Sequence, residues 1–275
     1  MRIFLTGGTG FIGKNFVKLA VNKGHYVTGV TRKKIKSYNK NISWLKGEIN
    51  SNWNKELSRS DMLVHLAAAG IHKSKDNEDI YNTNVFSSLE LLKKSIKYGC
   101  KKWLIISTSS EYGAKLNNRL TKFNVNTNRI PCNDYGLSKA IFTDQSIKLA
   151  KKFKCKLRIM RIFPVYGKGE NKKRLFPSLK KAARKGKDYF IKNPMEKRDF
   201  TSVKFVSEKL YDALDFNKKK FKTYQIWHIS ENKPQLVKNF ARLYWKKNNA
   251  KGKLLFRKNL KNKFNHLSDS TSLWK

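Results

Sequence analysis

The feature that most constrains this chain is a glycine-rich turn close to its start, Thr6 to Gly13. A short apolar run, Arg2 to Leu5, precedes the turn. A segment with apolar residues at helical spacing, Phe11 to Ala20, follows it. Strand, glycine turn and helix in this order begin a βαβ unit that binds a dinucleotide. The sequence therefore predicts a dinucleotide site at its first turn.

The glycines of this turn follow the spacing Gly7-x-x-Gly10-x-x-Gly13, not the more common G-x-G-x-x-G. We expect Gly7 to permit the tight turn, Gly10 to let a pyrophosphate approach the backbone, and Gly13 to allow close packing of the helix. Phe11 and Ile12 open that helix, whose N-terminal N–H groups and dipole attract phosphate. The alternative is an ordinary glycine-rich βα turn, but the flanking strand and helix favour the dinucleotide site.

The end of the next predicted strand, Gly24 to Thr31, indicates which dinucleotide binds. An acidic residue there would bond the ribose 2′-OH of NAD and repel a 2′-phosphate. This chain has Thr31 and Arg32, followed by two lysines. A hydroxyl and a guanidinium suit a 2′-phosphate, because arginine can grip it with two hydrogen bonds. We therefore expect NADP, with NAD as the alternative if the loop is merely basic.

Strands and helices alternate along the first half of the chain. Further strands are expected at 42–46, 61–66, 102–107 and 155–163, and helices at 79–98 and within 131–153. This order predicts an α/β fold with a Rossmann-type, doubly wound parallel sheet over residues 1–168. Residues 169–275 are expected to form a small substrate-binding lobe, partly interleaved with the first domain. His65, inside a strand, is expected to be a packed core residue, and His72 beyond it is a weaker candidate for a substrate contact.

The composition excludes some classes of protein and leaves others open. The chain has 275 residues, is 39% hydrophobic and has no apolar run long enough to span a membrane. It enters a strand at once, so no signal peptide is expected, and its three cysteines are predicted to be reduced thiols in the cytoplasm. No cysteine and histidine cluster has metal-ligand spacing. The net charge of +42 invites a nucleic-acid partner, but lysines in every segment favour a general compositional bias.

A second constellation, Tyr135-Gly-Leu-Ser-Lys139, carries acid–base chemistry. Positions i and i+4 share one face of a helix. We expect the Lys139 ammonium to lower the phenol pKa of Tyr135 from its ordinary value of about 10 and to hydrogen-bond the nicotinamide ribose. The spacing alone is weak, but it follows a strand that ends in Ser107-Thr108-Ser109-Ser110. A hydroxyl there can bond the same substrate oxygen as Tyr135.

With these motifs in view, the chain resembles the extended short-chain dehydrogenases/reductases, also called NAD-dependent epimerases/dehydratases, which act mostly on nucleotide sugars. The resemblance runs from residue 1 to about residue 240. It rests on eight ordered motifs: Gly7-x-x-Gly10-x-x-Gly13, Glu48-Ile49, His65–Ala68, Asn84-Val85, Ser107–Gly113, Tyr135-x-x-x-Lys139, Arg161–Gly167 and Arg198–Phe200.

The resemblance implies roles for residues at these motifs. Thr108 would supply the hydroxyl, Tyr135 the acid/base and Lys139 its support. The residues implied to border the cofactor are Glu48, Ile49, Leu66, Ala67, Ala68, Asn84, Lys139 and Phe163. On the substrate side the implied contacts are Thr108, Tyr135, Pro164 and Arg198, the last of which would grip a diphosphate. The resemblance also implies a homodimer with a four-helix interface built from the helices at 79–98 and 135–153.

Two departures from the family pattern bear on the reaction. Dehydratases of this family follow the hydroxyl residue with Asp-Glu, whereas this chain has Ser109-Ser110, and Glu111 comes one place late. A shift of one residue at a strand end turns a side chain to another face, so dehydratase activity is not expected. Pro164 stands where the family usually has Asn, so the sugar contact of that Asn is absent.

The leading hypothesis is an NADPH-dependent reductase of the 4-keto group of a nucleotide-diphospho-6-deoxy sugar. An NAD-dependent nucleotide-sugar epimerase is the runner-up. A binding protein for RNA is the alternative outside enzymes, and failure to bind RNA at physiological salt would exclude it. An inactive family member with a shortened C-terminus is the fourth. We expect no membrane partner, and a nucleic-acid partner is disfavoured because a pure binder has no use for Thr108, Tyr135 and Lys139.

Overall fold

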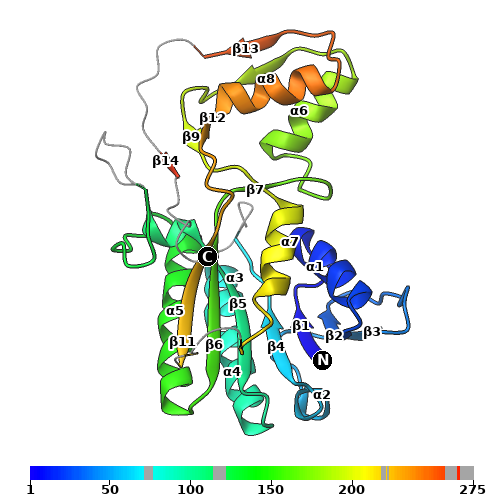
Figure 1. Cartoon of the computed structure of the whole chain (residues 1–275), viewed down its shortest axis with the longest axis vertical. Helices are drawn as coiled ribbons and strands as arrows, with labels where there is room; N and C mark the ends of the chain where they lie inside the picture. Colours follow the sequence, from blue (N-terminus) through cyan, green and yellow to red (C-terminus); the bar gives the residue numbers. More distant parts are fainter. Residues whose placement is uncertain (71–76, 114–121, 218–220, 222, 258–264, 267–275) are drawn as a thin grey trace.

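The computed structural model describes residues 1–70, 77–113, 122–217, 221, 223–257 and 265–266. Its centre is a parallel seven-stranded sheet in the order β11-β6-β5-β4-β1-β2-β3 (Figure 1). The strands are β1 (Arg2–Thr6), β2 (Tyr26–Thr31), β3 (Ile42–Lys46), β4 (Met62–His65), β5 (Lys102–Thr108), β6 (Lys156–Ile162) and β11 (Tyr224–Ile229). The sheet confirms the predicted α/β fold of Rossmann type. The first six strands begin and end within two residues of the predicted ranges.

Helices cover both faces of the sheet because successive strand residues point to opposite sides. Ile3 and Leu5 pack with one pair of helices, whereas Phe4 between them packs with helices on the other face. The first face carries α1 (Phe11–Asn22) and α7 (Val203–Asp212), and the second carries α2 (Asn54–Ser58), α4 (Ser88–Lys97) and α5 (Asp134–Lys152). The short helix α2 was not predicted from the sequence.

The glycine turn lies where the direction of the strand order changes. β1 pairs with β2 on one side and with β4 on the other, and its last residue, Thr6, lies opposite His65. In open α/β sheets, ligands bind at such a switch point, outside the carboxyl ends of the strands. β5 ends on the same edge at Thr108. The fold thus places the glycine turn and Thr108 on one edge of the sheet.

The predicted single helix at 79–98 is wrong in one respect, because it is three consecutive segments. They are α3 (Asn77–Tyr81), the π-helical turn η1 (Asn82–Ser87) and α4. Within the widened turn, the Asn84 amide hydrogen-bonds the backbone of Ala69 and the hydroxyl of Ser138. A π turn often marks a functional site, and this one lies beside the carboxyl end of β4.

A smaller lobe lies at one end of the sheet (Figure 1). Its core contains Leu179, Ile191, Phe200 and Phe240, with the rings of Phe200 and Phe240 stacked 3.9 Å apart. The lobe is built from α6 (Leu175–Arg184), β8 (Tyr189–Ile191), β9 (Lys197–Arg198), β12 (Gln235–Leu236), α8 (Val237–Lys247), β13 (Leu254–Phe256) and β14 (Asn265–His266).

The chain crosses between the sheet and the lobe more than once. It leaves after β6 and returns to the sheet for α7 and β11 before it enters the lobe again. Where the chain leaves and returns, β7 (Val165–Tyr166) pairs with β10 (Thr201–Ser202). The division into 1–168 and 169–275 stays a prediction. Among the described residues, no helix has both the length and the apolarity that crossing a membrane requires.

Candidate active site

The glycine turn is held by its own packing at two of its three motif positions. Gly7 has a φ of +73°, and a Cβ on it would lie 2.5 Å from the backbone nitrogen of Ala67. A Cβ on Gly13 would lie 2.1 Å from the carbonyl oxygen of Gly7. At Gly10 a Cβ would meet only the Gly7 oxygen, at 3.2 Å. The protein itself therefore requires glycine at positions 7 and 13, while the exposed Gly10 leaves room for a ligand.

The N-terminus of α1 offers hydrogen-bond donors at the same place. Gly10 is the N-cap, no side chain caps the helix, and its first turn has no acidic residue. Phe11 and Ile12 form that first turn and are half-buried. Backbone N–H groups and a positive dipole end therefore remain for an anion. This cradle fits the pyrophosphate of a dinucleotide.

At the end of β2, Thr31 is buried and Arg32 is exposed. The Thr31 carbonyl accepts a hydrogen bond from Gly47 at 3.0 Å, and its hydroxyl accepts one from the Lys33 amide at 3.3 Å. The first of these bonds brings the 48–49 segment beside β2, with Glu48 exposed and Ile49 packed on the core of the second face. This bond thus places the segment that carries Glu48 and Ile49 beside the strand end that carries Thr31 and Arg32.

The segment after β4 is positioned by one buried side chain. The Asn84 Oδ1 accepts from the Ala69 amide at 2.8 Å, and its Nδ2 donates to the Ala69 carbonyl at 3.1 Å. Leu66, Ala67 and Ala68 just before it are half-buried. The Asn84 amide is engaged with protein on both sides. It therefore fixes this segment beside the glycine turn.

Thr108, Tyr135 and Lys139 come together from β5 and α5. Thr108 is buried and its hydroxyl accepts a hydrogen bond from the Ser110 amide at 3.1 Å, and it lies near enough to the Tyr135 phenol to lower the pKa of that phenol. The Asn133 side chain caps α5 through the Gly136 amide at 2.8 Å, which orients the first turn that carries Tyr135. Lys139, one turn further along α5, is 3% exposed.

The pKa values of Tyr135 and Lys139 differ from those expected from the sequence. Burial raises the pKa of Tyr135 to about 12, and the hydrogen bond with Thr108 opposes this shift only in part. The prediction that Lys139 lowers the pKa of Tyr135 is therefore wrong for the protein without ligand. Burial also lowers the pKa of Lys139 to about 8, against the attraction of Glu111, which raises it. Desolvation is the largest cause of both shifts, although Lys139 is buried and Tyr135 only half-buried.

The expected substrate-side residues have protein partners of their own. The Phe163 ring is buried against His228 at a centroid distance of 5.1 Å, so it packs in the core. The carbonyl of Pro164 accepts from the Thr201 amide at 2.9 Å, at the junction with the lobe. The Nε and Nη2 of Arg198 each bond a Glu196 oxygen at 2.7 Å. The guanidinium fork of Arg198 is thus already occupied.

Three charged residues near the site were not assigned there from the sequence. Glu170 pairs with Arg174 at 3.3 Å, and burial raises its pKa. The charge of Arg174 lowers the pKa of Tyr135, so it lies close enough to act on the phenol. Glu111 acts on both Tyr135 and Lys139. The i,i+4 spacing of Glu170 and Arg174 was the one signal in the sequence for that pair.

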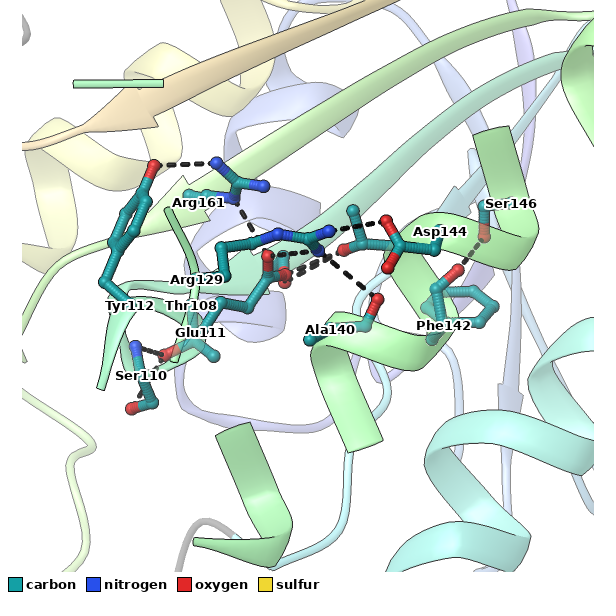
Figure 2. Close-up of polar contacts among 12 residues, drawn as sticks. Thr108, Ser110, Glu111, Tyr112, Arg129, Ala140, Phe142, Asp144, Ser146 and Arg161 are labelled. Atoms are coloured by element: carbon teal, nitrogen blue, oxygen red, sulfur yellow. Dashed lines mark hydrogen bonds and ion pairs between the residues drawn. The ribbon is translucent and has the colours of Figure 1, made fainter. Parts of the chain in front are cut away.

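Glu111 lies buried at the centre of an ionic cluster that extends to the surface at Asp144 (Figure 2). It sits in the 3-10 turn η2 (Ser109–Tyr112) and is 0% exposed. Its carboxylate accepts from the Arg161 Nε at 3.0 Å, the Arg129 Nη1 at 3.2 Å, the Thr143 hydroxyl at 2.7 Å and the Ser107 hydroxyl. We call Glu111, Arg161, Arg129 and Asp144 the Glu111 cluster. Bound in this way, the Glu111 carboxylate is fully engaged by protein groups.

The two histidines singled out from the sequence, His65 and His72, differ in what the structure says of them. His65 is buried between the Thr6 hydroxyl at 2.7 Å and the Ser88 hydroxyl at 3.0 Å, and burial lowers its pKa to about 3. It is a core residue, as expected, whereas His72 lies outside the described residues. Within the described part of the chain, no three His, Cys, Asp or Glu side chains gather as metal ligands would.

The fold, the glycine turn and the α1 N-terminus together define a dinucleotide-binding protein of Rossmann type. Residues 3–226 match the model of the NAD dependent epimerase/dehydratase family. The chain belongs to this family and is an enzyme of the extended short-chain dehydrogenase/reductase type.

Individual relatives agree with this assignment. A UDP-glucose 4-epimerase from Vibrio cholerae is 30% identical over 78% of this chain and 67% of its own length. A GDP-6-deoxy-D-talose 4-dehydrogenase from Aggregatibacter actinomycetemcomitans is 28% identical over 77% of this chain and 69% of its own. Among solved structures, MoeE5 in complex with UDP-glucuronic acid and NAD superposes with a TM-score of 0.86, at 20% identity, over 99% of this chain and 91% of that one. This last likeness shows the fold.

Proposed function

We propose that the chain is an NADPH-dependent reductase of the 4-keto group of a nucleotide-diphospho-6-deoxy sugar. The observation that carries the proposal is the pairing of a buried Thr31 with an exposed Arg32 at the end of β2. This pair favours a 2′-phosphate, and NADPH in turn favours net reduction over a hydride that returns to its substrate. The family assignment supports the nucleotide-sugar class.

The acid–base residues suit the reducing direction. NADPH supplies a hydride to the carbonyl carbon when bound. With a pKa of about 12, Tyr135 is protonated at neutral pH and can donate its proton to the oxygen that becomes an alkoxide. The Thr108 hydroxyl polarises the same oxygen. Lys139, with a pKa of about 8, is mostly charged at pH 7 and stabilises the developing negative charge.

The proposal is tested with a panel of nucleotide-diphospho 4-keto sugars, following oxidation of NADPH and of NADH by absorbance. We expect at least one member of the panel to oxidise NADPH in preference to NADH. Purified protein that carries tightly bound NAD and oxidises neither cofactor would exclude the reductase.

An NAD-dependent nucleotide-sugar epimerase is the second candidate. It is favoured by the Vibrio cholerae relative, which is named a UDP-glucose 4-epimerase. The mechanism would use the same Tyr135, but as a base in the first step, for which the raised pKa is unfavourable until a positively charged cofactor binds. Interconversion of the C4 epimers of UDP-glucose without added cofactor would support this candidate over the reductase.

The cofactor preference yields a prediction at Arg32. Arg32→Ala is expected to raise the KM for NADPH by roughly tenfold or more, because a charge-assisted contact with the 2′-phosphate is lost. The KM for NADH should stay within about twofold, since NADH has no such phosphate. Lys34→Ala removes an equal charge from the same exposed run and is the control. Equal effects of both variants on NADPH would refute a specific role for Arg32.

The pairing of Arg198 with Glu196 leads to a second prediction. A diphosphate has to compete with Glu196, whose carboxylate holds both the Nε and the Nη2 of the guanidinium. Glu196→Gln is therefore expected to tighten binding of UDP, GDP or dTDP about three- to tenfold in isothermal titration calorimetry. Arg198→Ala should weaken it by about tenfold or more. Glu208→Gln removes the same charge from exposed α7 and should leave affinity unchanged. Weaker binding by Glu196→Gln would contradict the competition.

We also propose a homodimer that forms through α4, α5 and the turn η1. Phe86 on η1 and Leu137 on α5 are 64% and 43% exposed, and such a dimer would cover both side chains. Sedimentation velocity should give a dimer, and a monomer at every concentration would contradict it.

A cytoplasmic location is proposed from the three cysteines, all of which are free thiols. Recovery of the native protein with its thiols oxidised would argue against that location.

A further inference from the structure

Glu111 connects the two elements that carry the catalytic residues. Its own turn η2 begins directly after Thr108, which caps that turn. Its partner Thr143 lies on α5 at i+4 from Lys139 and i+8 from Tyr135, which places the three residues on one face of the helix. A single carboxylate therefore holds the Thr108 turn against the face of α5 that presents Tyr135 and Lys139.

Two further elements reach the same carboxylate. Arg161 comes from β6 and also donates to the Tyr112 hydroxyl at 2.7 Å. Arg129 comes from the segment before α5 and also bonds the Ala140 carbonyl at 3.4 Å and Asp144 at 2.6 Å (Figure 2). The cluster thus fixes Glu111 from four directions. A side chain held this way loses little further freedom when a ligand binds.

The cluster is electrically balanced, with two carboxylates against two guanidinium groups. Lys139 itself is buried and lies over the Phe142 ring at 5.2 Å. The charged or titratable groups that act on this pair come from several elements: Glu111 from η2, His65 from β4 and Arg174 before α6. His65 is neutral at physiological pH, and Arg174 acts on Tyr135. Glu111 is therefore the negative charge that favours a protonated Lys139.

We propose that Glu111 is a positioning residue of this active site, which fixes Thr108 against the Tyr135–Lys139 face of α5 and sustains the charge of Lys139. The enzyme class supplies the dinucleotide as probe, and only the turnover readout rests on the proposed function. Affinity for the dinucleotide as a function of pH reports on Lys139 even when no nucleotide sugar is converted. Failure of the proposed function is thus distinguishable from failure of this inference.

The experiment alters the net charge of the cluster in both directions. Wild type, Glu111→Gln, Arg129→Gln and the double variant Arg129→Gln/Asp144→Asn are compared between pH 6 and 10. NADPH and NADH binding are followed by tryptophan fluorescence, and turnover is added where a substrate is found. Arg129→Gln leaves an uncompensated negative charge, so the alkaline loss of binding should move up by roughly half a pH unit. The double variant restores neutrality and should return to the wild-type position.

Glu111→Gln should move the same loss to lower pH, because it removes the negative charge that raises the pKa of Lys139. This variant leaves the buried Arg161 without its carboxylate and can fail to fold. In that case the comparison of Arg129→Gln with the double variant tests the proposal by itself. Arg129 is partly exposed, so its replacement is expected to leave the protein folded. If the Glu111 cluster had only a structural role, every variant would be less stable, and the pH at which binding is lost would not move in opposite directions. An Arg129→Gln profile that coincides with wild type, or moves down, overturns the proposal.

Discussion

Tyr135→Phe is expected to lower kcat by about 10³-fold, the usual contribution of a positioned general acid. The change removes one hydroxyl at the point where β5 and α5 meet, and it leaves the glycine turn and α1 untouched. NADPH affinity should therefore stay within about twofold of wild type. Stopped-flow or steady-state kinetics on a responsive 4-keto sugar, together with fluorescence titration of the cofactor, provide both measurements.

The control for this prediction is Tyr189→Phe in the lobe. Its hydroxyl bonds Ser178 at 2.6 Å and is partly buried, so the same atom is lost away from the acid–base residues. Turnover by Tyr189→Phe should remain within about twofold of wild type. Retention of turnover in Tyr135→Phe would show that another group protonates the substrate oxygen, and the mechanism would have to be abandoned.

Gly13→Ala is expected to destabilise the fold strongly. Its Cβ would lie 2.1 Å from the Gly7 carbonyl oxygen, and both the Cβ and that oxygen are attached to the backbone of the same tight turn. Neither can move without displacing α1 from β1, so we expect a loss of about 2–4 kcal/mol in the free energy of unfolding. Chemical denaturation measures this loss.

Gly10→Ala is the matched variant from the same motif. Its Cβ meets only one atom, at 3.2 Å, so the midpoint of unfolding should hardly change. If the turn binds the pyrophosphate as we predict, the methyl group would project into that site, so dinucleotide affinity should fall by roughly tenfold or more, about 1.4 kcal/mol. Destabilisation by Gly10→Ala equal to that of Gly13→Ala would mean that all three glycines serve the turn alone.

Most strands of the sheet could be predicted from local sequence patterns. The strand β3 has the predicted bounds, because alternating apolar residues and turn residues on both sides define it within a few positions. The π turn η1 could not be predicted in this way. It depends on contacts of Asn84 with Ala69 and Ser138, which lie 15 and 54 positions away. The return of the chain to the sheet at β11 likewise depends on pairing with β6, about 67 residues earlier.

In the candidate active site, too, short motifs were predictable from the sequence, whereas contacts between distant residues were not. The glycines, Thr108, Tyr135 and Lys139 belong to short motifs, so their positions were readable from spacing. Desolvation was not, and it reversed the expected direction of the pKa of Tyr135. The pairing of Glu196 with Arg198 depends on the turn that precedes β9, because Glu196 lies outside that strand. The ties of Glu111 to Arg161, 50 positions away, had no readable signal in the sequence.

The pairing of β7 with β10 has a consequence for how such a chain can diversify. The two strands bring residues 165–166 next to 201–202, so the segment between them starts and finishes at one place. Residues can be inserted, removed or exchanged within that segment without altering the register of the seven central strands. New ligand preferences can therefore arise in the lobe while the dinucleotide half is inherited unchanged.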